Sequence, residues 1–316
     1  VQSEVDNIKK QILKRLLHLA VIIIGLSFLT YLLMYISPGD PALKKLNAQG
    51  ISVSEETLEA AREEMGLNEP FLVRYAQWLG NALTGDLGTS YKDGLPVTDK
   101  LVHALRYTLI LSVGSLAVSL VAALPLSVIS AVKKDGLLDN VVRFLSFIGN
   151  SLPNFLISVL LMYFFCIRTK LLPVIAEENL KGLIMPCLAL AIPMCSRFIR
   201  QFRAEILEQL GRDYVLGARA RGVNSLTILF KNVLHNAMIP ILTIIALSVG
   251  TLLGGSVVVE TIFRWPGLGK LVMDSISVRD YPVIQGFVIF TSCVYVLINL
   301  AADICYRRLD PRVEEM

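Results

Sequence analysis

The stretch YTLILSVGSLAVSLVAALPLSVISAV, residues 107–132, contains no Lys, Arg, Asp or Glu. A helix that crosses a lipid bilayer needs roughly 20 consecutive apolar residues, so this stretch is long enough to span a membrane. Inside lipid the backbone must satisfy its own hydrogen bonds, which favours helices over strands. We therefore expect an all-α membrane protein with six transmembrane helices, because five further stretches lack the same residue types: 16–36, 144–167, 182–196, 236–259 and 281–302.

The composition agrees with a membrane protein. Of the 316 residues, 54% are hydrophobic, which exceeds the value of about 45–50% that is usual for soluble proteins. The stretch 182–196 is short, so we expect this helix to continue to residue 200, with the Arg197 side chain reaching the membrane interface. The formal net charge is only +4, and the distribution of the basic residues is more informative than their sum.

Basic residues gather in segments that alternate with the predicted spans. They occupy the lead 1–15, the loop between the second and third spans, the loop 201–235 and the tail 303–316. Because cytoplasmic loops carry an excess of Lys and Arg, these segments and both termini are predicted to be cytoplasmic. The apolar core of 16–36 is longer than that of a cleaved signal peptide, and no A-x-A site follows it, so a retained anchor is expected.

The long segment 37–106, which includes the start of the second span, is then external. Ser52 and Glu55 predict a capping box at the start of a helix that ends at Gly66. A second helix with an aromatic face is expected after Pro70. These patterns predict a small helical cap, which either helps to dock a partner or serves as a structural lid.

Nothing in the sequence predicts catalysis. His18 and His235 are expected at the inner edge of their spans and His103 at the outer edge, so a hydrocarbon layer of roughly 30 Å separates them. The five cysteines show no CxxC spacing and are interpreted as small hydrophobic residues. The GLGK motif at 267–270 lacks the other positions of a phosphate loop. We expect no catalytic residue, no metal site and no cofactor in this chain.

Small and polar residues inside the spans suggest close packing and interrupted helices. Gly250 and Gly254 form a GxxxG pair, extended by Gly255, that would let another helix approach closely. Pro125 and Pro153 are expected to break their helices. Nearby polar residues predict a translocation path, although hydrogen bonds between helices explain them equally well: Asn150, Asn154, Ser248, Thr251 and Ser256. No span carries a charge near its centre, so any transport must draw its energy from outside the pore.

The loop between the fourth and fifth spans reads DYVLGARARG at 213–222, followed by Asn236-Ala237 and Ile239-Pro240. This pattern resembles the EAA loop of the inner-membrane permeases of binding-protein-dependent ABC importers, most closely in their peptide and nickel branch. The wider family has Glu-Ala-Ala where this chain has Leu216-Gly217-Ala218, so the contacts of that glutamate do not carry over. Further motifs follow in the family's order, so that the resemblance covers residues 12–312: GDPA at 39–42, GDLGTS at 85–90, ETIF and WPGLG at 260–269, RDYPVIQ at 279–285 and LDPR at 309–312.

The resemblance implies a type I ABC importer permease fold in the bacterial inner membrane. It implies that the chain forms half of a pore with a second, homologous permease chain, that two cytoplasmic ATPase subunits hold ATP and Mg, and that an external substrate-binding protein delivers the cargo. No nucleic acid is expected among the partners. The residues expected to contact the ATPases are Asp213, Tyr214, Ala218, Arg219, Arg221 and Gly222, and the arginines can also set the topology.

Between the fifth and sixth spans, the segment 260–280 is expected outside the membrane as a short amphipathic scoop. The residues expected to dock the binding protein are Phe263, Trp265, Pro266, Gly267 and Tyr281, for which an aromatic belt at the membrane surface is the alternative. Within the family, the GDPAL, AQG and RDYPVIQ segments look most like importers of nickel or a metal chelate. A dipeptide or oligopeptide importer remains the main alternative, and a membrane scaffold or receptor subunit is a distant one.

Overall fold

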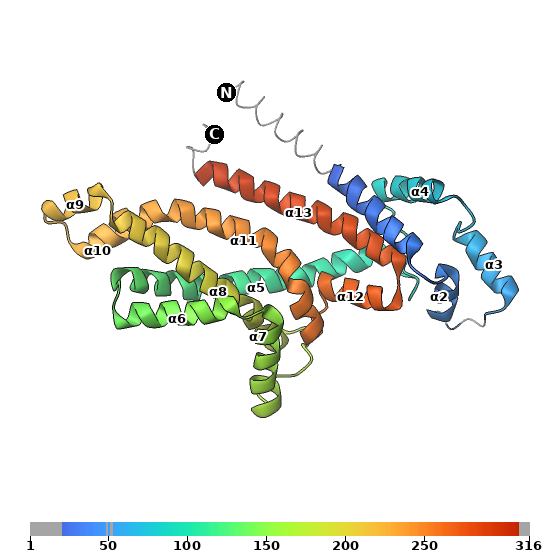
Figure 1. The fold of residues 1–316 in the computed structure, drawn as a ribbon, viewed down its shortest axis with the longest axis horizontal. Coiled ribbons are helices and arrows are strands. Elements are labelled where there is room, and N and C mark those ends of the chain that lie inside the picture. The colour runs from blue at the N-terminus through green and yellow to red at the C-terminus, as the bar shows by residue number, and fades with distance from the viewer. Residues whose placement is uncertain (1–20, 49, 51–52, 310–316) are drawn as a thin grey trace, which may run out of the picture. The chain divides into compact units, whose positions relative to one another are not determined.

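The computed structural model describes residues 21–48, 50 and 53–309, with side chains described for these residues except 48, 253, 255 and 299–309. The predicted lead 1–15, the beginning of the first span and the end of the tail therefore lie outside the described residues. The chain divides into two compact units. The N-terminal unit comprises Val1–Arg106 and Lys270–Leu297, and the central unit comprises Tyr107–Gly269 and Ile298–Met316. Every regular element of the described part is a helix (Figure 1).

The N-terminal unit is built around a layer of aromatic rings between its first helix, Val21–Ile36, and α4. Phe28, Tyr31 and Tyr35 face α4, and their ring centroids lie 5.0–5.8 Å from those of its aromatic residues. Such pairs contribute about 0.5–1.5 kcal/mol each beyond the burial of their surface. The elements of the unit are this helix, α2 (Pro41–Ala48), α3 (Glu55–Glu64), α4 (Phe71–Leu83) and parts of α5 (Val97–Val132), α12 (Leu268–Val278) and α13 (Tyr281–Leu309).

The predicted cap helices are present, but the first one starts later than expected. Its N-cap is Ser54, whose hydroxyl accepts from the Thr57 N–H at 3.1 Å, while Thr57 Oγ1 accepts from the Ser54 N–H at 2.9 Å. The capping box predicted for Ser52 and Glu55 was therefore wrong, because Glu55 is the first residue of the helix and Thr57 supplies the reciprocal bond. Gly66 follows the helix with a φ of +62°, as a glycine after a helix end commonly does.

The central unit packs around α8, which is the most deeply buried of the candidate spans. Phe198 and Phe202 of α8 stack at 5.1 Å and are fully buried within the main hydrophobic core. Besides the rest of α5, the elements of this unit are α6 (Leu137–Ser151), α7 (Asn154–Leu161), the π-helical η1 (Met162–Arg168), α8 (Leu180–Leu210), α9 (Asp213–Ala220), α10 (Ser225–Thr227), the π-helical η2 (Ile228–Val233) and α11 (Leu234–Phe263).

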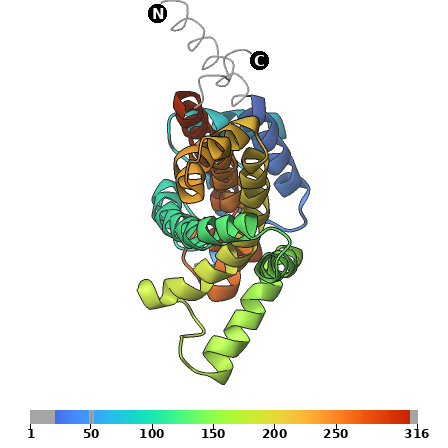
Figure 2. The same ribbon diagram turned by 90° about the vertical axis from the view of Figure 1, so that its left-hand side faces the viewer.

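Four helices of the described residues are long and apolar enough to cross a membrane, and two bent helix pairs raise this number to six if each pair is one span. The first pair is Val21–Ile36 with Pro41–Asn47, and the second is Leu137–Ser151 with Asn154–Arg168. The second pair bends by 103°, and α7 leaves the line of α6 in both ribbon views (Figures 1 and 2). The stretch 144–167, expected as one span, is therefore a bent pair that begins earlier, at Leu137.

The two prolines expected to break helices behave differently. Pro153 is the N-cap of α7, where its missing N–H costs nothing, and the helix breaks there as predicted. Pro125 lies inside the continuous helix α5, so the prediction of a break at Pro125 was wrong. In lipid, a full break would expose several backbone groups, whereas an uninterrupted helix leaves only one hydrogen bond unmade at the proline.

Candidate functional site

The segment that resembles a coupling loop forms a short helix, α9, which begins after Arg212 and ends at Ala220. Gly222 adopts a φ of +75°, where an L side chain is strained and glycine is not. The Gly222 N–H donates to Arg219 O at 2.9 Å, and the next N–H, that of Val223, donates to Ala218 O at 3.1 Å. Gly222 therefore ends α9 by satisfying carbonyl groups of its last turn.

The two faces of α9 differ sharply. Val215 and Ala218, three residues apart, are 0% and 4% exposed and belong to the core around α8. Leu216 is 59% exposed, and a Cβ added at Gly217 would meet none of the described atoms within 4 Å. The prediction that Ala218 faces a partner was therefore wrong, because its methyl group packs into its own chain. The apolar spacing of Val215 and Ala218 is the signal that could have shown this.

The other residues predicted for coupling lie on or beside the outer face of α9. Asp213, Arg219, Arg221 and Gly222 are exposed. Tyr214 is half-buried and lies near the end of α8, where its hydroxyl donates to Gln209 Oε1 at 3.1 Å. The exposed surface of α9 thus combines a leucine, an open glycine and two arginines, and we call it the α9 outer face.

A buried ion pair joins α6 to the part of α8 that leads toward α9. Arg203 donates to both carboxylate oxygens of Asp139, at 2.7 and 2.6 Å. Asp139 is 0% exposed and also accepts from Ser130 Oγ and from the Asp135 N–H. The two residues are 64 positions apart, so no local pattern of the sequence predicts this pair. A bidentate arginine–carboxylate pair fixes orientation as well as distance, so it locks α8 against α6.

The WPGLG motif, predicted to form an exposed scoop, is folded around a buried glutamate instead. Glu260 is 0% exposed, and its carboxylate accepts from Thr108 Oγ1 at 2.8 Å and from the Gly269 N–H at 2.7 Å. The two glycines leave room for this arrangement. A Cβ at Gly267 would lie 2.5 Å from the Glu260 carboxylate, and one at Gly269 would lie 2.4 Å from the Val257 Cα.

The residues predicted for external docking are therefore mostly covered. Phe263 and Trp265 are 1% and 2% exposed, and Trp265 Nε1 donates to Tyr107 O at 3.0 Å. Gly267 and Tyr281 are also buried, and Pro266 is half-buried. The expectation of an exposed aromatic scoop was wrong, because hydrogen bonds to Glu260 and Tyr107 hold the motif against the rest of the central unit.

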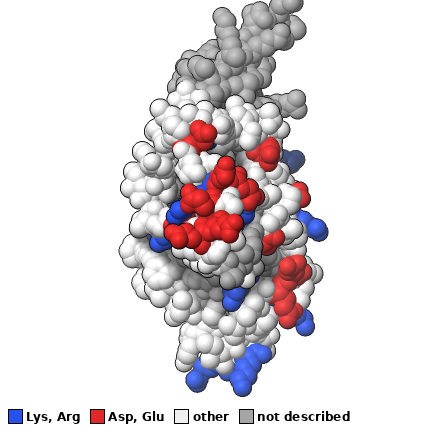
Figure 3. Space-filling view, turned by 90° about the vertical axis from the view of Figure 1, so that its right-hand side faces the viewer, with Lys and Arg blue, Asp and Glu red and all other residues white. Residues whose placement is uncertain are grey.

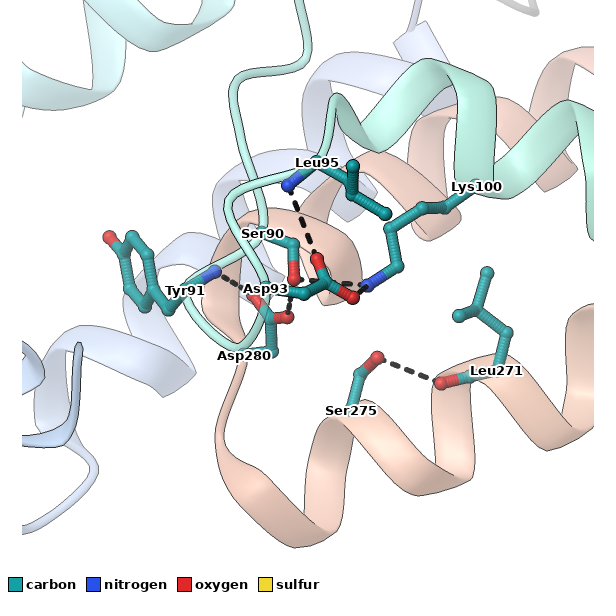
Figure 4. Close-up of polar contacts among 8 residues, drawn as sticks. All are labelled: Ser90, Tyr91, Asp93, Leu95, Lys100, Leu271, Ser275 and Asp280. Atoms are coloured by element: carbon teal, nitrogen blue, oxygen red, sulfur yellow. Dashed lines mark hydrogen bonds and ion pairs between the residues drawn. The ribbon is translucent and has the colours of Figure 1, made fainter. Parts of the chain in front are cut away.

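In the N-terminal unit, a third buried carboxylate joins the GDLGTS and RDYPVIQ motifs (Figure 4). Asp280 is 2% exposed and accepts from Ser90 Oγ and from the Tyr91 N–H, the latter at 2.9 Å. Lys100 Nζ donates to Ser90 Oγ at 3.0 Å and to Asp93 Oδ2 at 2.6 Å. We call this cluster of Ser90, Tyr91, Asp93, Lys100 and Asp280 the Asp280 clamp.

The surroundings of Asp93 favour its charged form. Partial burial raises the pKa of Asp93, but hydrogen bonds from Lys100 and Ser90 outweigh this effect and hold the pKa below its ordinary value. Beneath the clamp, Ser275 Oγ donates to Leu271 O at 2.8 Å within α12. The loop 85–96 is thus tied to the turn between α12 and α13.

The exposed surface of the cap is acidic. Figure 3 shows a cluster of acidic side chains over α3 on the side of the molecule that it presents. The residues of this acidic face on α3 are exposed: Glu55, Glu56, Glu59, Glu63 and Glu64. The glutamates of α3 are the signal in the sequence that could have predicted this acidic face.

The polar residues predicted for a translocation path are distributed over two places in the central unit. Asn150 and Asn154 are half-buried on either side of the α6–α7 bend. Ser248 and Thr251 lie on α11, and their hydroxyls donate to the carbonyls of Ile244 and Ser248 within the same helix. Ser256 is also on α11 and is fully buried. The path therefore stays a prediction, and for Ser248 and Thr251 the observed bonds are internal to their helix.

The glycines predicted for helix packing are only partly used within the chain. Gly250 is buried, whereas Gly254 is exposed, and a side chain there would meet no atom within 4 Å. Gly255 lies outside the described side chains. The tightest helix–helix approach at a glycine occurs at Gly149, where a Cβ would lie 2.2 Å from Ser196 Oγ. Packing by Gly254 stays a prediction about a partner chain.

Comparison with known proteins identifies what the chain is similar to. Residues 123–315 match the family model described as the inner membrane component of binding-protein-dependent transport systems, and residues 8–112 match the N-terminal model of such membrane components. Both models agree with the resemblance seen in the sequence.

Relatives of two kinds are similar over 96% of this chain. The nickel import system permease protein NikB of Staphylococcus aureus (strain MRSA252) is 39% identical, and 91% of its length is covered. The oligopeptide transport system permease protein AppB of Bacillus subtilis (strain 168) is 37% identical, with 98% of its length covered. The probable peptide ABC transporter permease protein y4tP of Sinorhizobium fredii is also 37% identical and covered to 98%.

Solved structures share the fold. A chain of the inward-facing MetNI methionine ABC transporter aligns with a TM-score of 0.56 and 19% identity, over 67% of this chain and 96% of that one. A chain of an amino acid ABC transporter with histidines aligns with a TM-score of 0.54 and 17% identity, over 68% of this chain and 94% of that one. At this identity the likeness concerns the fold alone.

Proposed function

We propose that the chain forms half of the pore of an importer for nickel or a nickel chelate. The proposal starts from its family: the chain belongs to the inner membrane components of binding-protein-dependent transport systems and is thus a multi-pass permease subunit of an ABC importer. The second half is a homologous permease chain, and the assembly lies in the bacterial inner membrane. Two ATPase subunits bind ATP and Mg on the cytoplasmic side.

The observation that carries this proposal is the division of α9 into two faces. Its inner face, Val215 and Ala218, is packed into the core that also contains residues of α8, so a force on α9 acts on that core. Its outer face offers Leu216, Gly217 and Arg219 to a partner. In the proposed cycle the ATPases close on ATP, move the α9 outer face, and shift the pore between two states that bind the cargo differently.

The acidic face on α3 is the surface that we propose for the substrate-binding protein. It takes the place of the predicted scoop, whose aromatic side chains are buried. The face is predominantly acidic, although Glu59 is paired with Arg62 and Glu64 with Lys45. A surface with an excess of one charge steers a partner of opposite charge. The binding protein would accordingly carry basic residues around the mouth of its own site.

Nickel stands first as the cargo because the GDPAL, AQG and RDYPVIQ segments look most like the nickel branch. Oligopeptide import is the second candidate, since the peptide permeases AppB and y4tP are similar to the chain at 37% identity, against 39% for NikB. In both cases the chain itself performs no chemistry, and ATP hydrolysis belongs to the partner subunits.

Uptake by cells distinguishes the two cargoes. We expect cells that lack this chain to lose most high-affinity uptake of radiolabelled nickel and to keep that of a labelled dipeptide, and we expect the restored chain to recover nickel uptake. Loss of dipeptide uptake with normal nickel uptake would assign the chain to the peptide importers instead. Unchanged uptake of both would overturn the proposed transport role.

A further inference from the structure

The N-terminal unit contains a cavity of about 540 Å³ for which the proposed transport cycle has no use. This volume lies within the range of about 300–1,000 Å³ that is usual for small-molecule sites. The wall combines aromatic rings with amide and charged side chains from several elements of the unit. Those on which the inference depends are Tyr31, Asp40, Arg62, Arg74, Trp78 and Tyr281.

Three polar groups at this cavity have no hydrogen-bond partner among the described residues. They are the hydroxyl of Tyr281, Nε1 of Trp78 and Nζ of Lys44, all of them buried atoms. Tyr281 and Trp78 line the cavity, and Tyr281 is 8% exposed. Lys44 Nζ lies over the ring of the lining residue Tyr281, 5.8 Å from its centroid. Buried polar groups are nearly always paired in native proteins, so a ligand is the natural partner for this set.

The chemistry of these groups defines the ligand. The Trp78 N–H and the Lys44 ammonium can only donate hydrogen bonds, and the Tyr281 hydroxyl can donate one. Lys44 also carries a positive charge, and Arg74 adds a second one to the wall. The carboxylate of Asp40 lines the cavity too, but it is paired with Arg62 Nη2 at 2.6 Å. The cavity therefore offers donors and positive charge to an anionic group.

The wall is held in place before any ligand arrives. In the Asp280 clamp, the Tyr91 N–H lies 2.9 Å from the Asp280 carboxylate (Figure 4). Tyr281 directly follows Asp280 in the chain, so the clamp also restrains its backbone. On another side, Tyr31 and Trp78 lie with their ring centroids 5.8 Å apart. Groups fixed in this way lose little freedom on binding, which favours affinity for a small ligand.

We propose that this cavity binds a small organic acid. Its carboxylate accepts hydrogen bonds from the Tyr281 hydroxyl and the Trp78 N–H near the Lys44 ammonium, and its apolar part lies against the rings of Tyr31 and Trp78. A lipid phosphate has similar oxygen atoms, but much of the wall comes from polar turns around Gly39, Gly66 and Gly88, which favours a soluble acid. The proposal does not depend on which cargo the importer carries.

The test uses the assembled transporter in nanodiscs and a matched pair of probes, 3-phenylpropionate and its amide. We expect saturable binding of the acid in a titration calorimeter and binding of the amide that is roughly tenfold weaker or more, because a hydrogen bond to a charged group is stronger than one to a neutral group. Tyr281→Phe removes only an oxygen that has no described partner, so the transporter should assemble normally and bind the acid roughly tenfold more weakly. Tyr163→Phe makes the same chemical change at an exposed tyrosine and should leave binding unchanged.

Several results would overturn the inference. Equal affinity for the acid and the amide would remove the role of the carboxylate. Equal losses in the two tyrosine variants would show that the acid binds elsewhere. Binding that disappears when anionic lipid is added to the nanodiscs, and returns in neutral lipid, would assign the cavity to a lipid headgroup. If neither probe bound saturably, the cavity would not be a site for a small organic acid.

Discussion

At the residue scale, two buried carboxylates and the small residues of α9 determine which side chains of the sequence motifs are covered and which are exposed. Glu260 accepts from the backbone of the WPGLG segment. Asp280 accepts from the Ser90 hydroxyl at the end of the GDLGTS segment and from the N–H of the next residue, Tyr91. Both carboxylates are buried; the first holds the WPGLG motif in place, and the second joins the GDLGTS and RDYPVIQ motifs. On α9 the roles are divided between neighbours, because Ala218 packs inward and Gly217 lies open.

The open position of Gly217 leads to a prediction about coupling. Gly217→Trp should leave folding and membrane insertion intact, because Gly217 is exposed and a Cβ there would meet none of the described atoms within 4 Å. The bulky ring should nevertheless separate the α9 outer face from its ATPase and reduce uptake about tenfold or more, equivalent to about 1.4 kcal/mol of lost coupling. Transport assays in proteoliposomes measure this effect.

The matched control is Gly217→Ala. Alanine favours a helix over glycine by about 0.8–1.0 kcal/mol and adds only a methyl group, so uptake should stay near normal. If the tryptophan variant transported as well as the alanine variant, the α9 outer face would not be the contact with the ATPase.

At the element scale, the central unit transmits force through packed helices. The α9 inner face belongs to the same core as Phe198 and Phe202 of α8, and the Asp139–Arg203 pair ties α8 to α6. After α6 the chain bends by 103° into α7, where Asn150 and Asn154 are half-buried. A displacement of α9 therefore has a continuous route of packed elements toward that bend.

The ion pair between α6 and α8 allows a prediction about stability. Asp139→Asn leaves the guanidinium of Arg203, which is 16% exposed, without its charged partner. Removing one member of a buried pair costs about 3–5 kcal/mol, so the thermal midpoint of the purified permease should fall by many degrees. A fluorescence-detected unfolding scan measures it.

An exposed pair at the end of α8 provides the comparison. Arg212 and Glu208 form an ion pair whose side chains are 57% and 56% exposed. Glu208→Gln should change stability by about 1 kcal/mol at most, because solvent screens exposed pairs. Equal destabilisation by the two variants would show that the Asp139–Arg203 ion pair does not stabilise the packing of α8 against α6.

At the scale of the whole molecule, the chain has features of one part of a larger assembly. Gly254 on α11 has open space where a side chain would be, and the α9 outer face offers Leu216 without a neighbour in its own chain that covers it. Members of the family to which the chain belongs are permease subunits of ABC importers. Surfaces of this kind are expected where other subunits pack.

Purification tests the proposed assembly. A tagged chain, extracted in mild detergent, should carry along a second permease chain of similar size and two ATPase subunits. Gly254→Trp should weaken the association with the second permease, whereas Gly217→Trp should weaken that with the ATPases. A tagged chain that purifies alone, with normal uptake by the same cells, would contradict the proposed assembly.

The sequence by itself determined the class of protein, the approximate positions of its helices and its family. Runs without charge are a local property, and lipid forces them into helices; ordered motifs identify a family without any knowledge of contacts. The break at Pro153 and the end of the cap helix at Gly66 were also predictable, since proline and glycine act on the backbone nearby.

Only the tertiary structure decided which side chains are available to partners. Trp265 and Ala218 looked like contact residues and are buried, while Gly217 and the acidic face on α3 lie outside. The Asp139–Arg203 pair, the bonds of Glu260 and the cavity beside Tyr281 join residues far apart in the chain. The physical reason is that burial and pairing depend on which elements pack together, and no local pattern of residues encodes that packing.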